Sequence, residues 1–225
     1  MNPIGTLHET SLHAAIKQLY ARPGDLIEEN VDGLIIDIVR ENTLIEIQTG
    51  NFSPLKYKFE RLLEKIPIRV VYPLPLNRTI LRIANNGELS SIRKSPKKGK
   101  IQDVFYELVR IPRYAIHTNF SLEVLYIEDE VVWCNDGRGS WRRKGWSIQD
   151  RRLVRIIGSR IFQGSQDYAS MLPDGLGKTF SSVDLIKLMG IRRTLAGKML
   201  YSLREMGIIE LAGKQGRFNL YKLAS

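Results

Sequence analysis

Hydrophobic positions in the first third of the chain recur first with helical spacing and then with strand spacing. Thr6 and Glu9 have the spacing of a capping box at the start of a helix. Two β-branched runs then flank a short polar turn, and a second helical stripe begins behind Ser53 and Pro54, a favourable helix start. The predicted elements are a helix at 7–20, strands at 26–31, 33–39 and 43–48, a helix at 55–66, and strands at 68–74 and 78–83.

Two later segments interrupt the hydrophobic pattern and predict the domain boundaries. Residues 85–100 are nearly free of large apolar side chains, and residues 164–179 contain Pro173, Gly175 and Gly177. Two apolar runs around Glu-Asp-Glu predict a hairpin over 121–133. We therefore expect a first domain at 1–84, a basic linker at 85–100, a middle region of unassigned fold at 101–163, and a last domain at 178–225.

Composition adds a charge imbalance to this pattern. The 225 residues include 43% apolar and 26% charged positions, which is ordinary for a soluble globular chain, and the net charge is +10. Residues 1–72 hold 8 basic and 10 acidic side chains, 73–178 hold 18 and 11, and 179–225 hold 8 and 3. A basic excess outside the first third predicts a polyanionic partner, nucleic acid before membrane.

Two further features bear on location and redox state. The single cysteine, Cys134, excludes an internal disulfide and a cysteine-based zinc site. The N-terminus lacks the pattern of a secretion signal, and no apolar run approaches the roughly 20 residues of a membrane helix. A cytoplasmic location without a membrane partner is the resulting expectation.

Candidate chemistry lies on the two strands around the predicted turn at Glu41-Asn42. A two-residue turn there places Asp37 opposite Glu46, with Gln48 on the same face and an apolar core face behind them. Two opposed carboxylates on a partly apolar face repel each other, so they need a shared proton, a basic neighbour or a divalent cation. An ordinary exposed hairpin with two acids on its wet side explains the spacing equally well.

The order of elements, with Asp37 followed nine residues later by Glu46-Ile47-Gln48, resembles the PD-(D/E)XK nuclease superfamily over about residues 6–84. This resemblance implies an α/β fold with a restriction endonuclease-like αβββαβ core, and a Mg²⁺ or Mn²⁺ ion bound by Asp37 and Glu46. It further implies that Gln48 orients the attacking water and that Glu9 is a third candidate ligand, although Glu9 also fits the capping box. Gln48 stands where lysine is usual, and no proline precedes Asp37; the neutral amide puts activity in question.

Residues 178–225 follow the order helix, turn, helix, hairpin, which resembles a winged helix-turn-helix domain. In such domains the second helix reads DNA with its first turns. The candidate contacts there are Arg192, Arg193 and Lys198, with Lys214 and Arg217 at the tip of the hairpin. The same pattern also serves protein contact or dimerisation.

A third basic cluster lies in the middle region, where Arg142, Arg143 and Lys144 fall between Trp141 and Trp146. Arginine binds phosphate and tryptophan stacks on bases, so this cluster is a DNA-binding candidate. A buried tryptophan pair beside solvated arginines is the plainer interpretation.

These features together predict a Mg²⁺- or Mn²⁺-dependent DNA endonuclease. The alternative is a non-catalytic, regulatory DNA-binding protein that retains an inactive nuclease fold, and a protein-interaction scaffold is a weaker third hypothesis. DNA is the expected partner, although RNA is not distinguished, and a homodimer would place two sites for cutting both strands.

Overall fold

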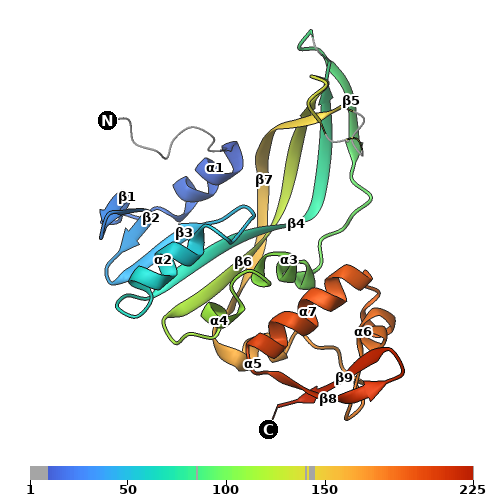
Figure 1. Cartoon of the computed structure of the whole chain (residues 1–225). Coiled ribbons are helices and arrows are strands. Elements are labelled where there is room, and N and C mark those ends of the chain that lie inside the picture. Colours follow the sequence, from blue (N-terminus) through green and yellow to red (C-terminus); the bar gives the residue numbers. More distant parts are fainter. Residues whose placement is uncertain (1–9, 85, 140, 142–144, 225) are drawn as a thin grey trace.

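The computed structural model describes residues 10–84, 86–139, 141 and 145–224, and the fold is mixed α/β (Figure 1). The first six elements are α1 (Ser11–Tyr20), β1 (Leu26–Val31), β2 (Leu34–Arg40), β3 (Thr43–Ile47), α2 (Leu55–Leu62) and β4 (Ile68–Ile83). The predicted order of helix, three strands, helix and strand is therefore confirmed.

The β2–β3 hairpin has the predicted register. Its cross-strand pairs are Ile38 with Ile45, Val39 with Leu44, and Arg40 with Thr43, as a turn at Glu41-Asn42 requires. The apolar face differs from the prediction at Leu34 and Ile36, because both pair with β1 and pack in a different core cluster from Ile38. The paired ladder between β2 and β3 thus ends at Ile38, and the segment before it follows β1.

The later strands are longer than their sequences suggest. Residues 68–83 form one strand despite Pro73 and Pro75, with an irregularity in its pairing just after Pro75. The hairpin predicted over 121–133 is wrong, because β6 (Phe120–Cys134) runs straight through it and pairs in parallel with β4. The Glu-Asp-Glu segment predicted to be the turn is part of the strand, and its acids form ion pairs with arginines. Glu128 binds Arg155, and Asp129 binds Arg78 and Arg151.

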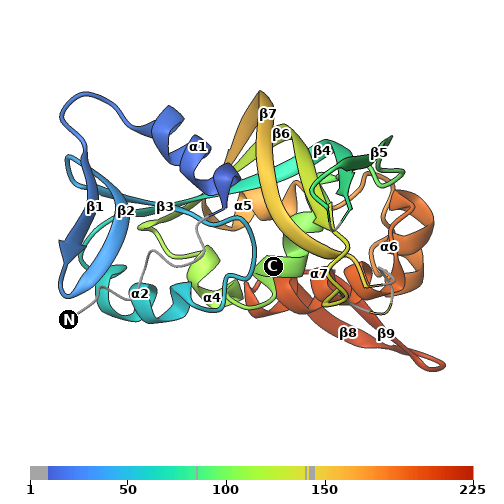
Figure 2. The same cartoon turned by 90° about the horizontal axis from the view of Figure 1, so that it is seen from above.

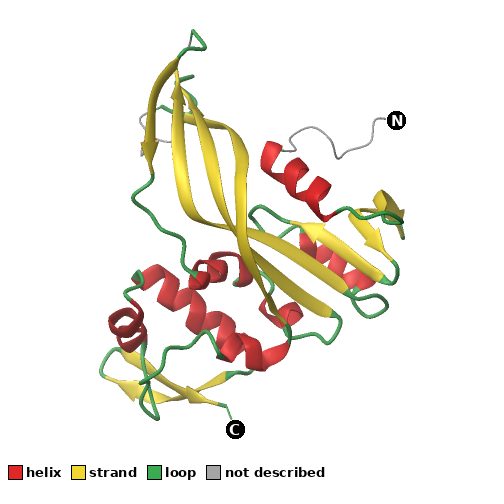
Figure 3. Ribbon diagram, turned by 180° about the vertical axis from the view of Figure 1, so that it is seen from behind, coloured by secondary structure: helices red, strands yellow, loops and turns green. Residues whose placement is uncertain are grey.

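The segment expected to be a linker contains a strand. β5 (Leu89–Lys94) pairs antiparallel with the second half of β4. β7 (Ser147–Phe162) pairs antiparallel with β6, and the described strands β1 to β7 form one mixed sheet in the order β1-β2-β3-β4-β6-β7, with β5 also on β4. The long strands rise together into an arm above the rest of the molecule (Figures 1 and 3). The boundary expected at 85–100 is thus not a break in the sheet.

The remaining elements lie mainly to one side of this sheet (Figure 1). They are η1 (Ile101–Val104), α3 (Phe105–Leu108), α4 (Pro112–Ala115), α5 (Gly164–Ala169), α6 (Ser182–Met189), α7 (Arg193–Glu205), β8 (Ile209–Gln215) and β9 (Phe218–Leu223). The helix, helix, hairpin order predicted for 178–225 is confirmed. Helix α6 begins after the Ser181 cap and ends at Gly190, whose φ of 58° is left-handed. No helix among the described residues is long and apolar enough to cross a bilayer.

Two hydrophobic clusters hold these layers together. The larger one joins α2, the middle of the sheet, α3 and α7, and it includes Phe59, Phe120 and Leu203. The smaller one lies under α1, where Leu12 and Ile16 cover Ile45 and its neighbours. Figure 2 shows α1 and α2 on different sides of the strands. Strand β3 is therefore buried on both faces, and any polar side chain on it enters the interior.

Candidate functional site

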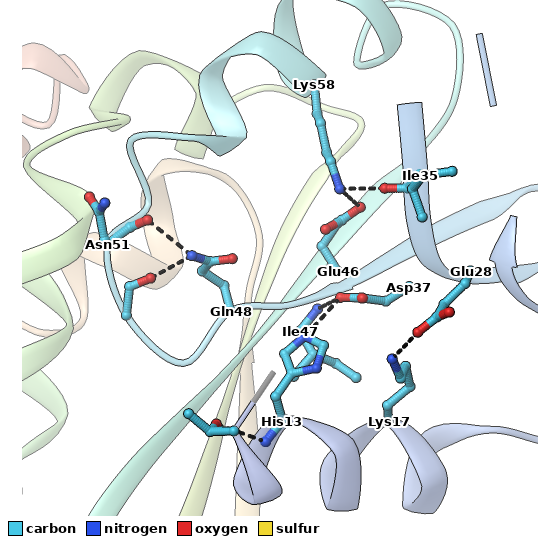
Figure 4. Close-up of polar contacts among 12 residues, drawn as sticks. His13, Lys17, Glu28, Ile35, Asp37, Glu46, Ile47, Gln48, Asn51 and Lys58 are labelled. Carbon is cyan, nitrogen blue, oxygen red and sulfur yellow. Dashed lines mark hydrogen bonds and ion pairs between the residues drawn. The ribbon is translucent and has the colours of Figure 1, made fainter. Parts of the chain in front are cut away.

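Glu46 is one of the few charged side chains that the fold buries, with 4% of its surface exposed. It lies on β3 and faces α2, where Lys58 donates a hydrogen bond to its Oε1 at 2.6 Å. The same Lys58 Nζ donates to the backbone oxygen of Ile35, also at 2.6 Å (Figure 4). Because α2 is anchored in the core by the adjacent Phe59, the ammonium group is held over the acid.

Asp37, on β2, lies beside Glu46. Its contacts come from the backbone of β3 and from α1, whereas those of Glu46 come from α2. Its Oδ2 accepts a hydrogen bond from the backbone N–H of Ile47 at 2.8 Å. The Nε2 atom of His13, on α1, lies 3.3 Å from the same oxygen (Figure 4). The Asp37 carboxylate therefore bridges the end of β3 and the first helix.

The two acids have opposite pKa shifts. Burial raises the pKa of Glu46 to about 7; the positive charge of Lys58 opposes this rise, and the negative charge of Asp37 adds to it. Burial also acts to raise the pKa of Asp37, but the hydrogen bonds from His13 and Ile47 outweigh it, so that this pKa lies below its usual value. Asp37 is thus ionised at neutral pH, whereas Glu46 exchanges its proton close to pH 7.

Gln48 follows on the same strand and has a structural task. Its backbone N–H donates to Val71 on β4, and its side-chain amide donates to the backbone oxygens of Gly50 and Asn51, at 2.5 and 3.0 Å (Figure 4). The amide therefore fixes the loop between β3 and α2. Its two N–H donors are occupied, which leaves the side-chain oxygen for any other contact.

Two residues of this site were missed by the sequence analysis. Lys58 and His13 each lie on the helix that flanks one of the acids, at positions where helical spacing alone gives no reason to single them out. Gln48 is neutral at the position where the nuclease superfamily usually has lysine. This missing positive charge was the sequence signal that a cation such as Lys58 comes from another element. Glu9 lies outside the described residues, and Glu29 is exposed on β1.

The oxygens available to a hard cation are limited but suitable. Among the described contacts, Asp37 uses Oδ2 and Glu46 uses Oε1, so each carboxylate keeps one oxygen without a hydrogen-bond partner. Within the described residues, no cluster of three or more His, Cys, Asp or Glu side chains is arranged to hold a metal ion. Mg²⁺ commonly takes one or two carboxylates and completes its shell with water and substrate phosphate. The pair therefore fits that class of site, and not an all-protein cage.

A cleft of about 310 Å³ opens next to Gln48. Thr49 forms its edge, and Tyr72, Arg78 and Arg151 line it. Arg151 donates to the backbone oxygen of Thr49 at 3.2 Å and shares the buried Asp129 with Arg78. Burial lowers the pKa of Arg151, and the neighbouring charge of Arg78 lowers it further. Two guanidinium groups thus share one carboxylate beside the loop that Gln48 fixes.

The predicted DNA-binding residues fall into two groups. Arg142, Arg143 and Lys144 lie outside the described residues. Of the flanking tryptophans, Trp141 is 83% exposed, whereas the Trp146 ring lies 5.1 Å from the Arg82 guanidinium. The basic residues after Trp146 lie on strand β7, not on a helix.

The C-terminal cations are well placed for contact with a partner. Arg192, Arg193, Lys214 and Arg217 are exposed and Lys198 is half-buried. None of these five has an acidic partner among the described residues. The acids of this region, by contrast, are engaged: Asp184 in the α6 cap, Glu205 with Arg113, and Glu210 with Lys222.

The fold and site together define a mixed α/β protein with a buried acid, Glu46, next to a half-buried one, Asp37, and an exposed basic C-terminal unit. The chain belongs to the family described as a domain of unknown function (DUF8091), whose model matches residues 10–163. Over 221 residues it is 32% identical to an uncharacterized protein of Treponema pallidum (strain Nichols), which covers 97% of this chain and 87% of that relative. No solved structure matches the chain. The family match runs from α1 to the end of β7, so it contains the whole acid pair.

Proposed function

We propose that the protein is a metal-dependent DNA endonuclease of the PD-(D/E)XK type, with a winged-helix unit at its C-terminus. The observation that carries the proposal is the pair formed by the buried Glu46 and the half-buried Asp37, whose pKa values are driven in opposite directions beside Lys58. Placing a buried acid next to a second, half-buried acid is unfavourable unless something offsets or uses their charge.

Each residue has a definable task in this chemistry. Asp37 stays ionised and supplies a permanent anionic ligand, oriented by His13 and the Ile47 N–H. Glu46 becomes a second anionic ligand once its proton leaves. A bound Mg²⁺ or Mn²⁺ would lower the pKa of its water and neutralise charge on the leaving oxygen.

Lys58 supports the proposal because it provides the cation that Gln48 lacks. Its ammonium group reaches the acid from α2, so a positive charge is present next to Glu46 although the strand itself carries an amide. Lys58 would stabilise negative charge on the phosphate or on the attacking water. The side-chain oxygen of Gln48 is left to accept a hydrogen bond from that water.

We place the substrate strand in the cleft at Thr49, whose lining adjoins Gln48 through the chain but does not include Asp37, Glu46 or Lys58. Arg78 and Arg151 line it, and guanidinium groups bind phosphate well. A backbone running through this cleft would pass beside the loop between β3 and α2, which begins at Gln48. The basic C-terminal unit would hold the duplex itself.

One set of contacts favours a second function, that of a non-catalytic DNA-binding protein. Lys58 occupies one oxygen of Glu46, and the Gln48 amide is consumed by the backbone of its own loop. A nuclease fold that has lost its chemistry would look the same and would still bind DNA through its cations.

The test is a cleavage assay on linear and branched duplex DNA with Mg²⁺ and with Mn²⁺. We expect wild type to cut, and Asp37→Asn and Glu46→Gln to lose at least about a thousandfold in rate, since each removes an anionic ligand and about 4 kcal/mol corresponds to that factor. Lys58→Met should lose less, by about a hundredfold. Glu29→Gln, on the neighbouring strand, is the matched control and should cut normally.

Cleavage that survives in both acid variants would exclude the proposed site. A wild type that cuts nothing with either metal, yet binds duplex, would establish the non-catalytic alternative.

A further inference from the structure

The cleft of about 310 Å³ beside the sheet has a second wall that the proposed function does not use. The first wall is the sheet itself, from which Arg78 on β4 and Arg151 on β7 line the cleft. The second wall comes from η1 and α3 and contributes Asp103, Tyr106 and Glu107. A cationic wall thus faces an acidic one across a cavity at the lower end of the size range of small-molecule sites.

The cationic wall carries one positive charge more than the protein balances. Arg78 and Arg151 share the single carboxylate of Asp129, and the side chain of Arg151 is only 17% exposed. The Arg151 Nε is buried without a hydrogen-bond acceptor, and among the described contacts the Nη1 group of Arg78 has none either. An uncompensated, largely buried cation is unfavourable. This wall therefore fits an anion, and paired guanidinium groups match the oxygens of a phosphate.

The acidic wall offers a free hydrogen-bond acceptor. Oε2 of Glu107 accepts a hydrogen bond from Arg110 at 2.9 Å, whereas Oε1 has no partner among the described contacts. Burial raises the pKa of Tyr72 to about 12; the charge of Glu107 adds to this rise and the charge of Arg151 opposes it. The Tyr72 hydroxyl group is thus close enough to interact with both walls. A cation and a free acceptor therefore share one cavity.

Between the two walls the lining is apolar. It includes Pro73, Leu74 and Pro75 of β4, together with the ring of Tyr106. Gly99 lies where the chain before η1 passes over β4, and a Cβ at this position would collide with the backbone oxygen of Pro75. Only glycine allows this close approach, so the passing segment forms a fixed side of the cleft. An apolar lining with an aromatic ring suits a nucleobase.

We infer that this cleft binds one nucleotide, with its phosphate on Arg78 and Arg151 and an amino group of its base donating a hydrogen bond to Oε1 of Glu107. Adenine, cytosine and guanine carry such an amino group, whereas thymine and uracil do not. The nucleotide is either a free one or a single nucleotide of the substrate strand. The second source rests on the proposed function, and the first does not.

The experiment is isothermal titration calorimetry of the full chain, with EDTA present so that no cleavage intervenes. The probes are two pairs of nucleotides that differ in the amino group, dCMP with dUMP and dAMP with dIMP. The amino member of each pair should bind about tenfold more tightly, because its partner leaves the acceptor unpaired. Deoxycytidine and inorganic phosphate, each representing half of the ligand, should both bind more weakly than dCMP.

Two substitutions separate the two walls. Glu107→Gln should bring the affinities for dCMP and dUMP within about twofold of each other, since an amide both donates and accepts. Arg78→Lys keeps the charge but loses the forked phosphate contact, so it should weaken both nucleotides by about tenfold and leave their ratio unchanged. The matched controls are Glu60→Gln and Arg155→Lys, whose side chains are also hydrogen-bonded but lie outside the lining of the cleft. Both should bind as wild type does.

Equal affinities within both pairs would overturn the inference. So would dCMP binding no more tightly than phosphate, or no binding of any nucleotide at millimolar concentration. Competition with a fluorescent DNA duplex identifies the source: displacement by dCMP means that a nucleotide of the strand occupies the cleft, and simultaneous binding means that a free nucleotide does. Nucleotide binding without DNA cleavage would sink only the hydrolytic function, whereas cleavage without nucleotide binding would sink only this inference.

Discussion

The sheet and the C-terminal unit handle charge in opposite ways. Among the described residues, the buried acids are Glu46, Glu123 and Asp129, all on sheet strands, and each has a cation within 4 Å. In the C-terminal unit, residues 180–223, the buried polar residues are the neutral Ser181 and Ser202. Its unpaired cations are all at or near the surface.

This difference separates two kinds of chemistry. Charges buried in the sheet have strong mutual interactions and shifted pKa values, so they influence stability and suit reactions. Charges on the C-terminal unit are screened by solvent and hold little folding energy, so they suit reversible binding to a polyanion. Four substitutions test the contrast, beginning with the strongest buried interaction.

Asp129→Ala should destabilise the protein most. Asp129 is 1% exposed and receives hydrogen bonds from Arg78 and Arg151, so its removal leaves two guanidinium groups facing each other. The expected loss is about 3–5 kcal/mol in the free energy of unfolding, measured by urea denaturation.

The control for that substitution is Glu128→Ala, one residue earlier, whose partner Arg155 is largely exposed. It should lose far less stability than Asp129→Ala, because an exposed ion pair is screened by solvent. Equal losses for the two variants would mean that burial does not set the strength of these ion pairs.

Glu46→Gln should change how stability depends on pH. The folded state raises the pKa of Glu46 from 4.5 to about 7, so between these values it holds a proton that the unfolded chain has lost. Wild-type stability contributed by this group is therefore fully present below about pH 4.5 and falls as pH rises to 7, by about 3 kcal/mol. Glutamine has no such proton, so the difference between the two proteins should grow in the variant's favour across this range.

The measurement is chemical denaturation of both proteins at pH 5 and pH 8. Glu29→Gln, at an exposed acid on β1, should follow wild type at both values. Parallel curves for wild type and Glu46→Gln would show that Glu46 is ionised throughout.

Arg193→Ala and Lys214→Ala should have the smallest effects. Neither side chain has an acidic partner among the described residues, so stability should change by less than about 0.5 kcal/mol. Each should reduce the slope of log affinity for duplex DNA against log salt by about one unit, measured by fluorescence anisotropy. Lys222→Ala, whose charge is already paired with Glu210, is the control and should keep the wild-type slope.

The local elements were predictable from sequence because they depend on neighbouring residues. The Glu41-Asn42 turn fixed the β2–β3 register, and the Ser181 cap and Gly190 bounded α6. The second half of the sheet was not predictable, because Glu128 and Asp129 look like turn residues until the arginines that pair with them are brought alongside. Those partners come from β4 and β7, which are distant in sequence.

The residues of the candidate site also divide into those predictable from local sequence and those that depend on tertiary packing. Asp37, Glu46 and Gln48 were found by strand spacing, whereas Lys58 and His13 depend on how α2 and α1 pack over the sheet. The interior position of Glu46 was missed because β3 looked like a strand with one wet face. Strand β3 has no solvent-exposed face, because α2 packs on one side of it and α1 on the other.

The parallel pairing of β4 with β6 also sets the order in which the chain can assemble. It joins Ile68 to Phe120 and Ile83 to Cys134, and the intervening chain through β5, η1, α3 and α4 must close into a loop before any of these bonds form. Such distant pairing is slow relative to local hairpins and helices. The β1–β3 meander and the C-terminal helices can thus form early. Strand β7 has no partner until β6 is in place, so a newly made chain carries this arginine-rich strand unprotected until then.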